Sequence, residues 1–328
     1  MSVAIAGGTG GLGRALVEAI QARGRYQVIV LTRKVSGSPA GPNGIRFVAV
    51  DYANVDSLVS VLQGKSVEIV ISAVNNITGE NDAELNLIRA AERSSTTKRF
   101  IPSYFGVPYL PEQYETFPPA MAKKSALAAL KSTSLEWTAV YNGYFLDYFG
   151  TPKVKSYMDD VSFFVDVANN VAAIPGSGEV PVVFTHSFDV ARLVAALLEK
   201  SKWPEETYII GDKVTFHEMV RLAEKVKGKY SEGFPFGQFL TARPGTKFTV
   251  AHDSVKDLQA CKLTELPSHR QFYQIYPKEM LHGFLAPFGL NCERGQADLK
   301  PSRTLNEEFP EIKAMKAKDV LEQGWGRA

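Results

Sequence analysis

The chain has 328 residues, of which 45% are hydrophobic and 22% are charged, and its formal net charge at pH 7 is +2. This composition is ordinary for a globular protein, and the length suffices for one large domain or two intertwined ones. Basic and acidic residues are interleaved along the chain, so the sequence lacks the one-sided positive charge expected of a nucleic-acid-binding protein.

The cysteine, histidine and apolar residues argue against a disulfide-rich protein, a zinc protein and a membrane-spanning protein. Cys261 and Cys292 are too few for a disulfide framework, and the five histidines lack the spacing of zinc ligands. No stretch reaches the ~20 apolar residues that a membrane span needs, and the apolar start at 3–6 runs directly into a glycine loop. We therefore expect a cytoplasmic, reduced and metal-free protein with no nucleic-acid or membrane partner.

The first 150 residues alternate between short apolar runs and helical patterns. The apolar runs predict strands at 3–6, 28–31, 45–50, 67–74, 99–102 and 135–141. Between the strands, apolar residues recur at helical spacing within 12–20, 55–62, 85–91 and 121–130. Continuous apolar strands separated by helices are typical of a parallel sheet covered on both faces and connected by right-handed crossovers. The sequence therefore predicts a doubly wound α/β fold.

The pattern becomes less regular after residue 150. We predict strands at 182–184 and 207–210 and helices at 189–198, 216–226 and 276–284, among proline- and glycine-rich connections. Residues 182–212 are interpreted as returning to the sheet of residues 1–150. Residues 151–181 and 213–328 then form a smaller, mixed substrate lobe, packed over the carboxyl ends of the strands.

Residues 7–13 read GGTGGLG and stand between the first predicted strand and the first predicted helix. In such a loop Gly7 permits a sharp turn, Gly10 lets the backbone approach a pyrophosphate, and Gly13 lets the helix pack closely on the strand. The amino terminus of the helix offers N–H groups and a positive dipole end to the phosphates. A flexible turn is the alternative, but the strand-loop-helix context predicts a Rossmann domain that binds a dinucleotide over residues 1–150.

The end of the second predicted strand indicates which dinucleotide binds. A site for NAD normally places an acid there, about 20 residues beyond the glycines, to hold the ribose 2′-hydroxyl. This chain instead has Arg33 and Lys34. A guanidinium suits a 2′-phosphate through paired hydrogen bonds, so we predict NADPH, with a solvated loop cation as the alternative for Arg33.

The glycine loop at 7–13, the segment KRFIPSYFG at 98–106 and a lysine near residue 123 occur together in this chain. In these features it resembles the NmrA-like and isoflavone reductase-like branch of the atypical short-chain dehydrogenases. The resemblance covers most of the chain, recurs at 183–185 and 189–191, and becomes weak after about residue 215.

The resemblance implies an NADPH-dependent reductase of an aromatic or polyketide-like secondary metabolite. Reductases of this group lack the tyrosine of the YxxxK pair and use a lysine at the start of the helix after the fifth strand. Counting back from the family-like segment at 142–145, that lysine is Lys123, with Lys124 adjacent to it. This chain likewise has no YxxxK motif after Tyr104, Tyr109 or Tyr114.

The strand ends and the resemblance together predict the cofactor site. Its predicted residues are Gly7, Thr9, Gly10, Gly11, Leu12, Gly13, Arg33, Lys34, Asp51, Ser72, Ala73, Val74, Ser103, Phe105, Lys123, Asn142 and Phe145. Asp51 follows the third strand, where it is placed to reach the adenine or is an exposed turn residue. Ser72, Ala73 and Val74 end the fourth strand, at the level of a nicotinamide ribose.

Reduction of a carbonyl or a conjugated double bond generates an oxyanion or enolate, which needs a proton donor. A lysine that is partly desolvated can donate at working pH, because burial lowers its pKa. Lys123 is the predicted catalytic residue; without the resemblance, a solvated helix cation is the alternative. The predicted substrate residues are Tyr104, Tyr144, Tyr148, Phe164 and His186, each with a purely structural packing role as the alternative.

Two other functions are compatible with the same sequence. One is a non-catalytic NAD(P)-sensing regulator of the NmrA-like group, which binds partner proteins without turnover. The other is a non-redox isomerase or cyclase on the same fold, which consumes no NADPH. The chain is expected to be a monomer or a homodimer.

Overall fold

The computed structural model describes residues 1–35, 41, 44–228, 247–274 and 276–326. The chain divides into two compact units. The first unit comprises Met1–Asn142, Ser187–Ile209 and Pro301–Lys313, and the second comprises Gly143–His186, Ile210–Lys300 and Ala314–Ala328. In contrast to the predicted ranges, the strand at 182–185 lies in the second unit and residues 301–313 lie in the first. Within the predicted lobe at 213–328, residues 229–246 lie outside the described residues.

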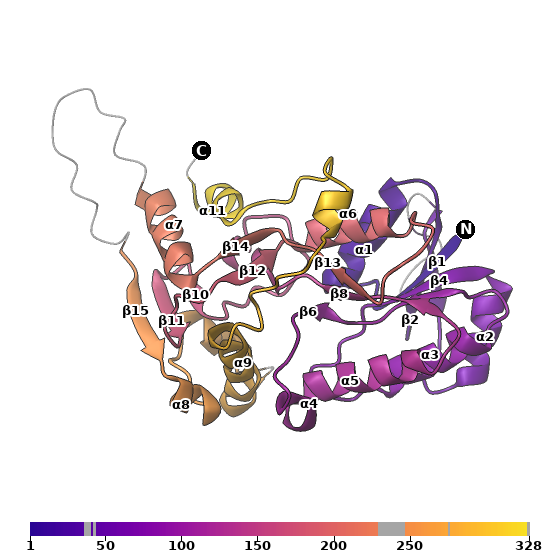
Figure 1. The fold of residues 1–328 in the computed structure, drawn as a ribbon, viewed down its shortest axis with the longest axis horizontal. Coiled ribbons are helices and arrows are strands. Elements are labelled where there is room, and N and C mark those ends of the chain that lie inside the picture. The colour runs from indigo at the N-terminus through magenta and orange to yellow at the C-terminus, as the bar shows by residue number, and fades with distance from the viewer. Residues whose placement is uncertain (36–40, 42–43, 229–246, 275, 327–328) are drawn as a thin grey trace. The chain divides into compact units, whose positions relative to one another are not determined.

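A parallel six-stranded sheet in the order β3-β2-β1-β4-β5-β7 is the centre of the first unit. The unit contains, in chain order, β1 (Ser2–Ala6), α1 (Gly11–Ala22), β2 (Gln27–Thr32), β3 (Arg46–Ala49), α2 (Val55–Gly64), β4 (Val67–Ser72), α3 (Asp82–Arg93), β5 (Arg99–Ile101), β6 (Phe105–Gly106), α4 (Gln113–Thr116), α5 (Pro118–Lys131), β7 (Glu136–Trp137), β8 (Ala139–Tyr141), α6 (Ser187–Leu197), β13 (Glu206–Tyr208) and α10 (Leu305–Glu308). Helices α1 and α6 lie on one side of the sheet, and α2, α3 and α5 lie on the other (Figure 1). The predicted doubly wound sheet is confirmed.

The apolar character of the central strands explains this layering. Every residue of β1 is buried, as are the four central residues of β2 and five of the six residues of β4. Strands that are buried on both faces carry continuous rather than alternating apolar residues. Of the predicted stripe on α1, Leu12, Ala15, Leu16 and Ile20 are buried, whereas Ala19 is half-buried. Local patterning and tertiary packing therefore agree in this part of the chain.

The predicted strand at 135–141 forms two short strands, β7 and β8, that have different partners. β7 pairs with β5, whereas β8 pairs with β6 and β13 in a second, three-stranded sheet. Pro102 follows β5 and has no backbone N–H to donate, which explains why β5 ends there and β6 provides the next pairing partner. Between the two strands, Thr138 is buried and its Oγ1 lies 2.8 Å from Oγ1 of Thr207.

The second unit is mixed, as predicted. It contains β9 (Tyr144–Phe145), η2 (Leu146–Phe149), β10 (Val165–Asp166), β11 (Val171–Pro175), β12 (Val182–Thr185), β14 (Asp212–Val214), α7 (Phe216–Gly228), β15 (Thr249–Asp253), α8 (Val255–Gln259), η3 (Pro267–Phe272), α9 (Lys278–Glu293) and α11 (Ala317–Trp325). Its sheets, β10-β11-β15 and β14-β12-β9, each combine a parallel and an antiparallel pair. None of the helices in the described ranges is long and apolar enough to cross a membrane.

Candidate functional site

The three glycines of the loop between β1 and α1 have different surroundings. Gly7 has a positive φ of 75°, and a Cβ atom there would lie 2.3 Å from the carbonyl oxygen of Ala73. At Gly13, a Cβ atom would lie 2.2 Å from the carbonyl oxygen of Gly7. At Gly10, by contrast, a Cβ atom would meet no described atom within 4 Å. Gly7 and Gly13 therefore allow close backbone packing, whereas Gly10 borders open space.

The amino terminus of α1 faces that open space without a cap. Gly10 is the N-cap residue, and within the described residues no side chain caps the helix and no acid lies in its first turn. Thr9 and Gly10 are exposed, while Leu12 is buried and Gly11 is half-buried. Uncapped N–H groups at a helix amino terminus favour an anion. The loop therefore fits the pyrophosphate of a dinucleotide.

Other predicted cofactor residues lie at the carboxyl ends of neighbouring strands. Ala73 donates its backbone N–H to Ala6 O at 2.9 Å, and Ser103 donates its hydroxyl to Val74 O at 2.8 Å. These bonds link the ends of β1, β4 and β5. Ser72 is fully buried at the end of β4, and Phe105 is half-buried on β6. Asn142 follows β8, and its N–H donates to Gly106 O at 3.0 Å.

The predicted residues beyond β2 and β3 are exposed. Arg33 and Lys34 directly follow β2, where the hydroxyl of Thr32 donates to Lys34 O at 3.1 Å. Asp51 accepts a hydrogen bond from the N–H of Ala53 at 2.9 Å through its own carboxylate. Arg33 is thus exposed, whereas the Asp51 carboxylate already takes part in the turn that precedes α2.

Lys123 lies on α5 with its ammonium against two aromatic rings. Its Nζ is 4.8 Å from the centre of the Tyr104 ring and 5.8 Å from that of Tyr109. A Cβ atom at Gly106 would lie 3.7 Å from the same Nζ. Burial lowers the pKa of Lys123 to about 8, although the nearby Glu84 carboxylate acts in the opposite direction. A lysine with such a pKa is able to exchange a proton near neutral pH.

The neighbouring Lys124 has different surroundings. Its side chain is exposed and forms an ion pair with Glu115. Successive helix positions point about 100° apart, so only one of the two lysines can face the tyrosines. That lysine is Lys123.

Sequence reasoning missed Glu84, which lies in the first turn of α3 and is 1% exposed. Its Oε1 accepts the backbone N–H of Ser103 at 2.6 Å, and its Oε2 accepts a bond from Asn76 Nδ2 at 2.8 Å. A signal for it exists in the sequence. Glu84 stands three, four and seven residues before Leu87, Ile88 and Ala91, which places an acid on the buried stripe of the helix.

The predicted substrate residues of the second unit belong to a cluster of aromatic rings. The cluster surrounds a cavity of about 20 Å³ and consists of Tyr144, Phe145, Tyr148, Phe149, Phe163, Phe164, Phe184 and Phe216, and Val165 also lines the cavity. Tyr144 and Phe164 are buried, whereas Phe145, Tyr148 and Phe163 are half-buried. The rings of Tyr148 and Phe163 stack with their centres 4.5 Å apart. The half-buried rings are the ones that keep accessible aromatic surface.

The remaining predicted substrate residues are buried. His186 of the second unit is 2% exposed, and its Nε2 lies 3.7 Å from Oδ1 of the buried Asp147. The same Oδ1 accepts a bond from Ser156 Oγ at 2.5 Å. In the first unit, Tyr104 is fully buried, and its hydroxyl lies 3.0 Å from that of Tyr114. Both side chains have defined partners inside the fold.

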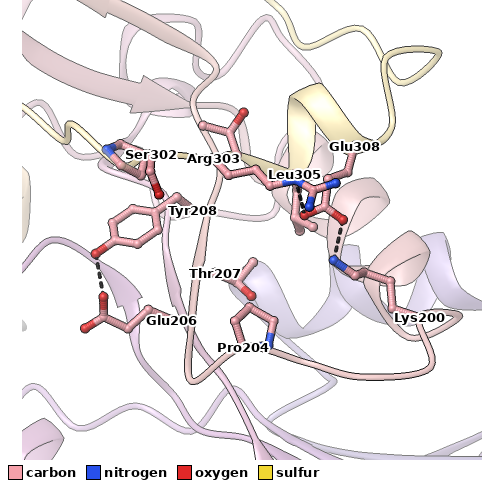
Figure 2. Close-up of a pocket in the computed structure, with 11 residues that line it drawn as sticks. Lys200, Pro204, Glu206, Thr207, Tyr208, Ser302, Arg303, Leu305 and Glu308 are labelled. Atoms are coloured by element: carbon pink, nitrogen blue, oxygen red, sulfur yellow. Dashed lines mark hydrogen bonds and ion pairs between the residues drawn. The ribbon is translucent and has the colours of Figure 1, made fainter.

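A cavity of about 540 Å³ lies elsewhere in the first unit, between β13 and the segment that contains α10 (Figure 2). Its lining residues are Lys200, Pro204, Glu206, Thr207, Tyr208, Pro301, Ser302, Arg303, Thr304, Leu305 and Glu308. Figure 2 shows Lys200 and Arg303 directed at Glu308, while Tyr208 donates to Glu206 at 2.8 Å. None of the predicted site residues lines this cavity. Its charged groups also have partners, so we do not assign the reaction to it.

Comparison with known proteins supports the grouping suggested by these residues. The model of the NmrA-like family matches residues 1–233. Oxidoreductase BOA1 of Botryotinia fuckeliana (strain B05.10) is 35% identical over 311 residues, which cover 94% of this chain and 95% of that protein.

Solved structures share the fold over nearly the whole chain. A leucoanthocyanidin reductase–NADPH complex from Vitis vinifera has a TM-score of 0.69 at 15% identity and covers 98% of both chains. AtPrR2 with NADP+ and (+)pinoresinol has a TM-score of 0.66 at 22% identity, covering 98% of this chain and 97% of that one. With its glycine loop, its doubly wound sheet and a family match over more than two thirds of its length, the chain belongs to the NmrA-like family.

Proposed function

We propose that this chain is an NADPH-dependent reductase of an aromatic or polyketide-like secondary metabolite. It is an oxidoreductase, like the BOA1 relative that matches it almost end to end. The observation that carries the proposal is the placement of Lys123. Lys123 is half-buried and its ammonium lies against the rings of Tyr104 and Tyr109, in the same unit as a glycine loop that fits a pyrophosphate.

The cofactor choice is supported by residues of the first unit and by the relatives. The leucoanthocyanidin reductase structure holds NADPH, and the AtPrR2 structure holds NADP+. In this chain the uncapped amino terminus of α1 would hold the pyrophosphate, and Arg33 at the end of β2 would hold the 2′-phosphate. Bound NADPH supplies a hydride to the substrate. Ser72, Ala73 and Val74 would hold its nicotinamide ribose, and Ser103 supports this segment by its bond to Val74 O.

Lys123 acts as the proton donor. When a carbonyl is reduced, its oxygen gains negative charge and must take up a proton. The Nζ of Lys123 gives that proton to the oxygen, and the amine is then reprotonated from solvent. With a pKa near 8, the ammonium is the main form at neutral pH and still gives up its proton readily. The same group would protonate the enolate oxygen if a conjugated double bond were reduced.

The aromatic cluster of the second unit supports a flat, apolar or phenolic substrate. Tyr148 and Phe163 offer a stacked, half-buried pair of rings, and aromatic faces bind flat ligands by offset stacking. Within the second unit, this pair is the predicted contact for such a ligand. The buried Tyr104, Tyr144, Phe164 and His186 hold the surrounding structure in place instead.

The test compares Lys123→Ala with Lys124→Ala. NADPH binding is measured by the fluorescence of the bound cofactor, and turnover is measured by NADPH consumption with a panel of aromatic ketones and enones. We expect both variants to bind NADPH. Lys123→Ala should turn over at least ~100-fold more slowly, the lower range for general acid catalysis. Lys124→Ala should retain the parent rate, because its side chain pairs with Glu115 at the surface.

The outcomes separate the alternatives. A Lys123→Ala enzyme that runs at the parent rate would refute the catalytic assignment. Tight binding of both NADPH and NADP+ without turnover of any panel member would favour a redox-sensing regulator. Conversion of a substrate without NADPH consumption would favour an isomerase or cyclase.

A further inference from the structure

Glu84 is a buried acid on the core-facing side of α3. It is 1% exposed in the first turn of α3, and burial of an ionised carboxylate is expensive unless the charge is paired. Both of its carboxylate oxygens accept hydrogen bonds from N–H donors, one from Ser103 N and one from Asn76 Nδ2. Such bonds favour the charged form, in opposition to the burial that raises its pKa.

The contacts of Glu84 connect it to the surroundings of Lys123. Ser103, which donates to Glu84 at 2.6 Å, directly precedes Tyr104, and the Tyr104 ring lies against the Lys123 ammonium. Asn81, the N-cap of α3, donates to the backbone oxygen of Ala122 at 2.7 Å, one residue before Lys123. The amino end of α3 is therefore tied both to the segment that carries Tyr104 and to the helix that carries Lys123.

Among the described residues, Glu84 is the acid that affects the pKa of Lys123. From the segment after β5, Tyr104 and Tyr109 present their ring faces, and burial raises the pKa of both phenols, which keeps them neutral. From its own helix, Lys124 is directed at Glu115. From α3, the Glu84 carboxylate raises the pKa of Lys123 against the larger effect of burial.

We propose that Glu84 is a positioning residue whose buried carboxylate keeps Lys123 in the protonated form that donates to substrate. The proposal rests on the proposed function for its catalytic meaning. The electrostatic coupling between the Glu84 carboxylate and the Lys123 ammonium can be measured without cofactor or substrate.

The experiment titrates Lys123 directly in the full-length protein by nuclear magnetic resonance, with carbon-13 at the ε-carbon of lysine. The Lys123 signal is identified by its absence from the spectrum of Lys123→Met. In Glu84→Gln, which keeps the shape of the side chain but removes its charge, the pKa of Lys123 should fall by about one unit. Asp82→Asn removes an exposed acid from the same helix turn and should leave it unchanged. An unchanged pKa in Glu84→Gln, or an equal fall in Asp82→Asn, would overturn the proposal.

A reciprocal measurement covers the case in which Glu84→Gln does not fold. Coupling between two sites acts equally in both directions, so Lys123→Met should raise the pKa of Glu84 by a matching amount. A Glu84 carboxyl that titrates alike in the parent and in Lys123→Met would overturn the proposal.

Kinetics then distinguish this inference from the proposed function. With an active substrate, the alkaline limb of the kcat profile should move to lower pH in Glu84→Gln by the same shift as the Lys123 titration, and it should stay in place in Asp82→Asn. The Lys123 pKa could fall in Glu84→Gln while Lys123→Ala keeps the parent rate. That result would support the coupling between Glu84 and Lys123 and would refute only the catalytic role of Lys123.

Discussion

The ammonium of Lys123 lies 4.8 Å from the centre of the Tyr104 ring, and this ring is fully buried. A cation held over an aromatic face gains about 0.5–2 kcal/mol, depending on how well water is excluded. The Tyr104 hydroxyl lies 3.0 Å from that of Tyr114. The two parts of the Tyr104 side chain therefore have separable roles.

Substitutions of Tyr104 test this separation. Tyr104→Phe keeps the ring beside Lys123 and should lower the free energy of unfolding by only about 1 kcal/mol, the usual contribution of one hydrogen bond. Tyr104→Leu removes the aromatic face and should also slow turnover, because the Lys123 ammonium loses its contact with the ring. Urea unfolding measures the first effect and single-turnover rates measure the second. If Tyr104→Phe slowed turnover as much as Tyr104→Leu, the hydroxyl would have a part in the reaction that the ring contact does not explain.

The pH dependence of turnover follows from the pKa of Lys123. Burial lowers this pKa to about 8, so the ammonium is present below that pH and is lost above it. Because the ammonium is the proton donor for reduction, kcat should be constant in the neutral range and fall about tenfold per pH unit above pH ~8. Lys124→Ala should show the same profile. A rate that stays constant up to the ordinary lysine range near pH ~10.4 would contradict the assignment.

The open space at Gly10 allows a sharp test of the glycine loop. A side chain at this position meets no described atom within 4 Å, so Gly10→Val should fold, with a loss of about 1 kcal/mol at the N-cap. Its branched side chain should nevertheless abolish NADPH binding, because it occupies the space that the pyrophosphate needs. NADPH titration and urea unfolding measure the two effects.

Two further glycines serve as controls for this test. Gly64→Val, at the exposed end of α2 where a Cβ also has open space, should fold and bind NADPH normally. Gly13→Ala should instead destabilise the fold, because its Cβ would lie 2.2 Å from the Gly7 carbonyl oxygen. Full NADPH affinity in folded Gly10→Val would place the dinucleotide elsewhere.

Arg33 tests the choice between the two nicotinamide cofactors. If its guanidinium holds the 2′-phosphate, the parent protein should bind NADPH at least tenfold more tightly than NADH, a difference of ~1.4 kcal/mol. Arg33→Ala should remove most of this preference and leave NADH binding nearly unchanged. Arg46→Ala, an exposed arginine at the amino end of β3, is the matched control. Equal affinities of the parent for NADPH and NADH would rule out the role of Arg33.

The features predicted correctly from the sequence depend on local patterns. The strands of the central sheet are continuous apolar runs, and α1 carries its buried residues at helical spacing. The loop is recognisable because three of its seven positions favour glycine for different reasons. Gly7 has a positive φ, Gly13 lies against the backbone of Gly7, and Gly10 borders open space. The role of Lys123 stays a prediction from family resemblance, because nothing in its immediate sequence distinguishes it from Lys124.

The features that were missed depend on tertiary pairing. The division of the strand at 135–141 follows from its partners, since β5 ends before Pro102 and β6 begins later. Strands of two residues, such as β9 and β10, have too few positions to show a period. The hydrogen bonds of the Glu84 carboxylate to Ser103 and Asn76 form only in the folded chain. Its position on an apolar helix stripe is nevertheless a sequence signal for a buried acid.

The first unit is assembled from three separate stretches of the chain, and the last of them begins at Pro301. Lys200, close behind α6, pairs with Glu308 of this last stretch and fixes it to the rest of the unit, while Arg303 pairs with the same carboxylate from within the stretch. On the ribosome, where proteins are made from the amino terminus, the nucleotide-binding half therefore stays incomplete until almost the whole message has been read. Premature stop codons or carboxyl-terminal deletions that remove residues 301–313 should consequently damage cofactor binding, even though every glycine of the loop has long been synthesised.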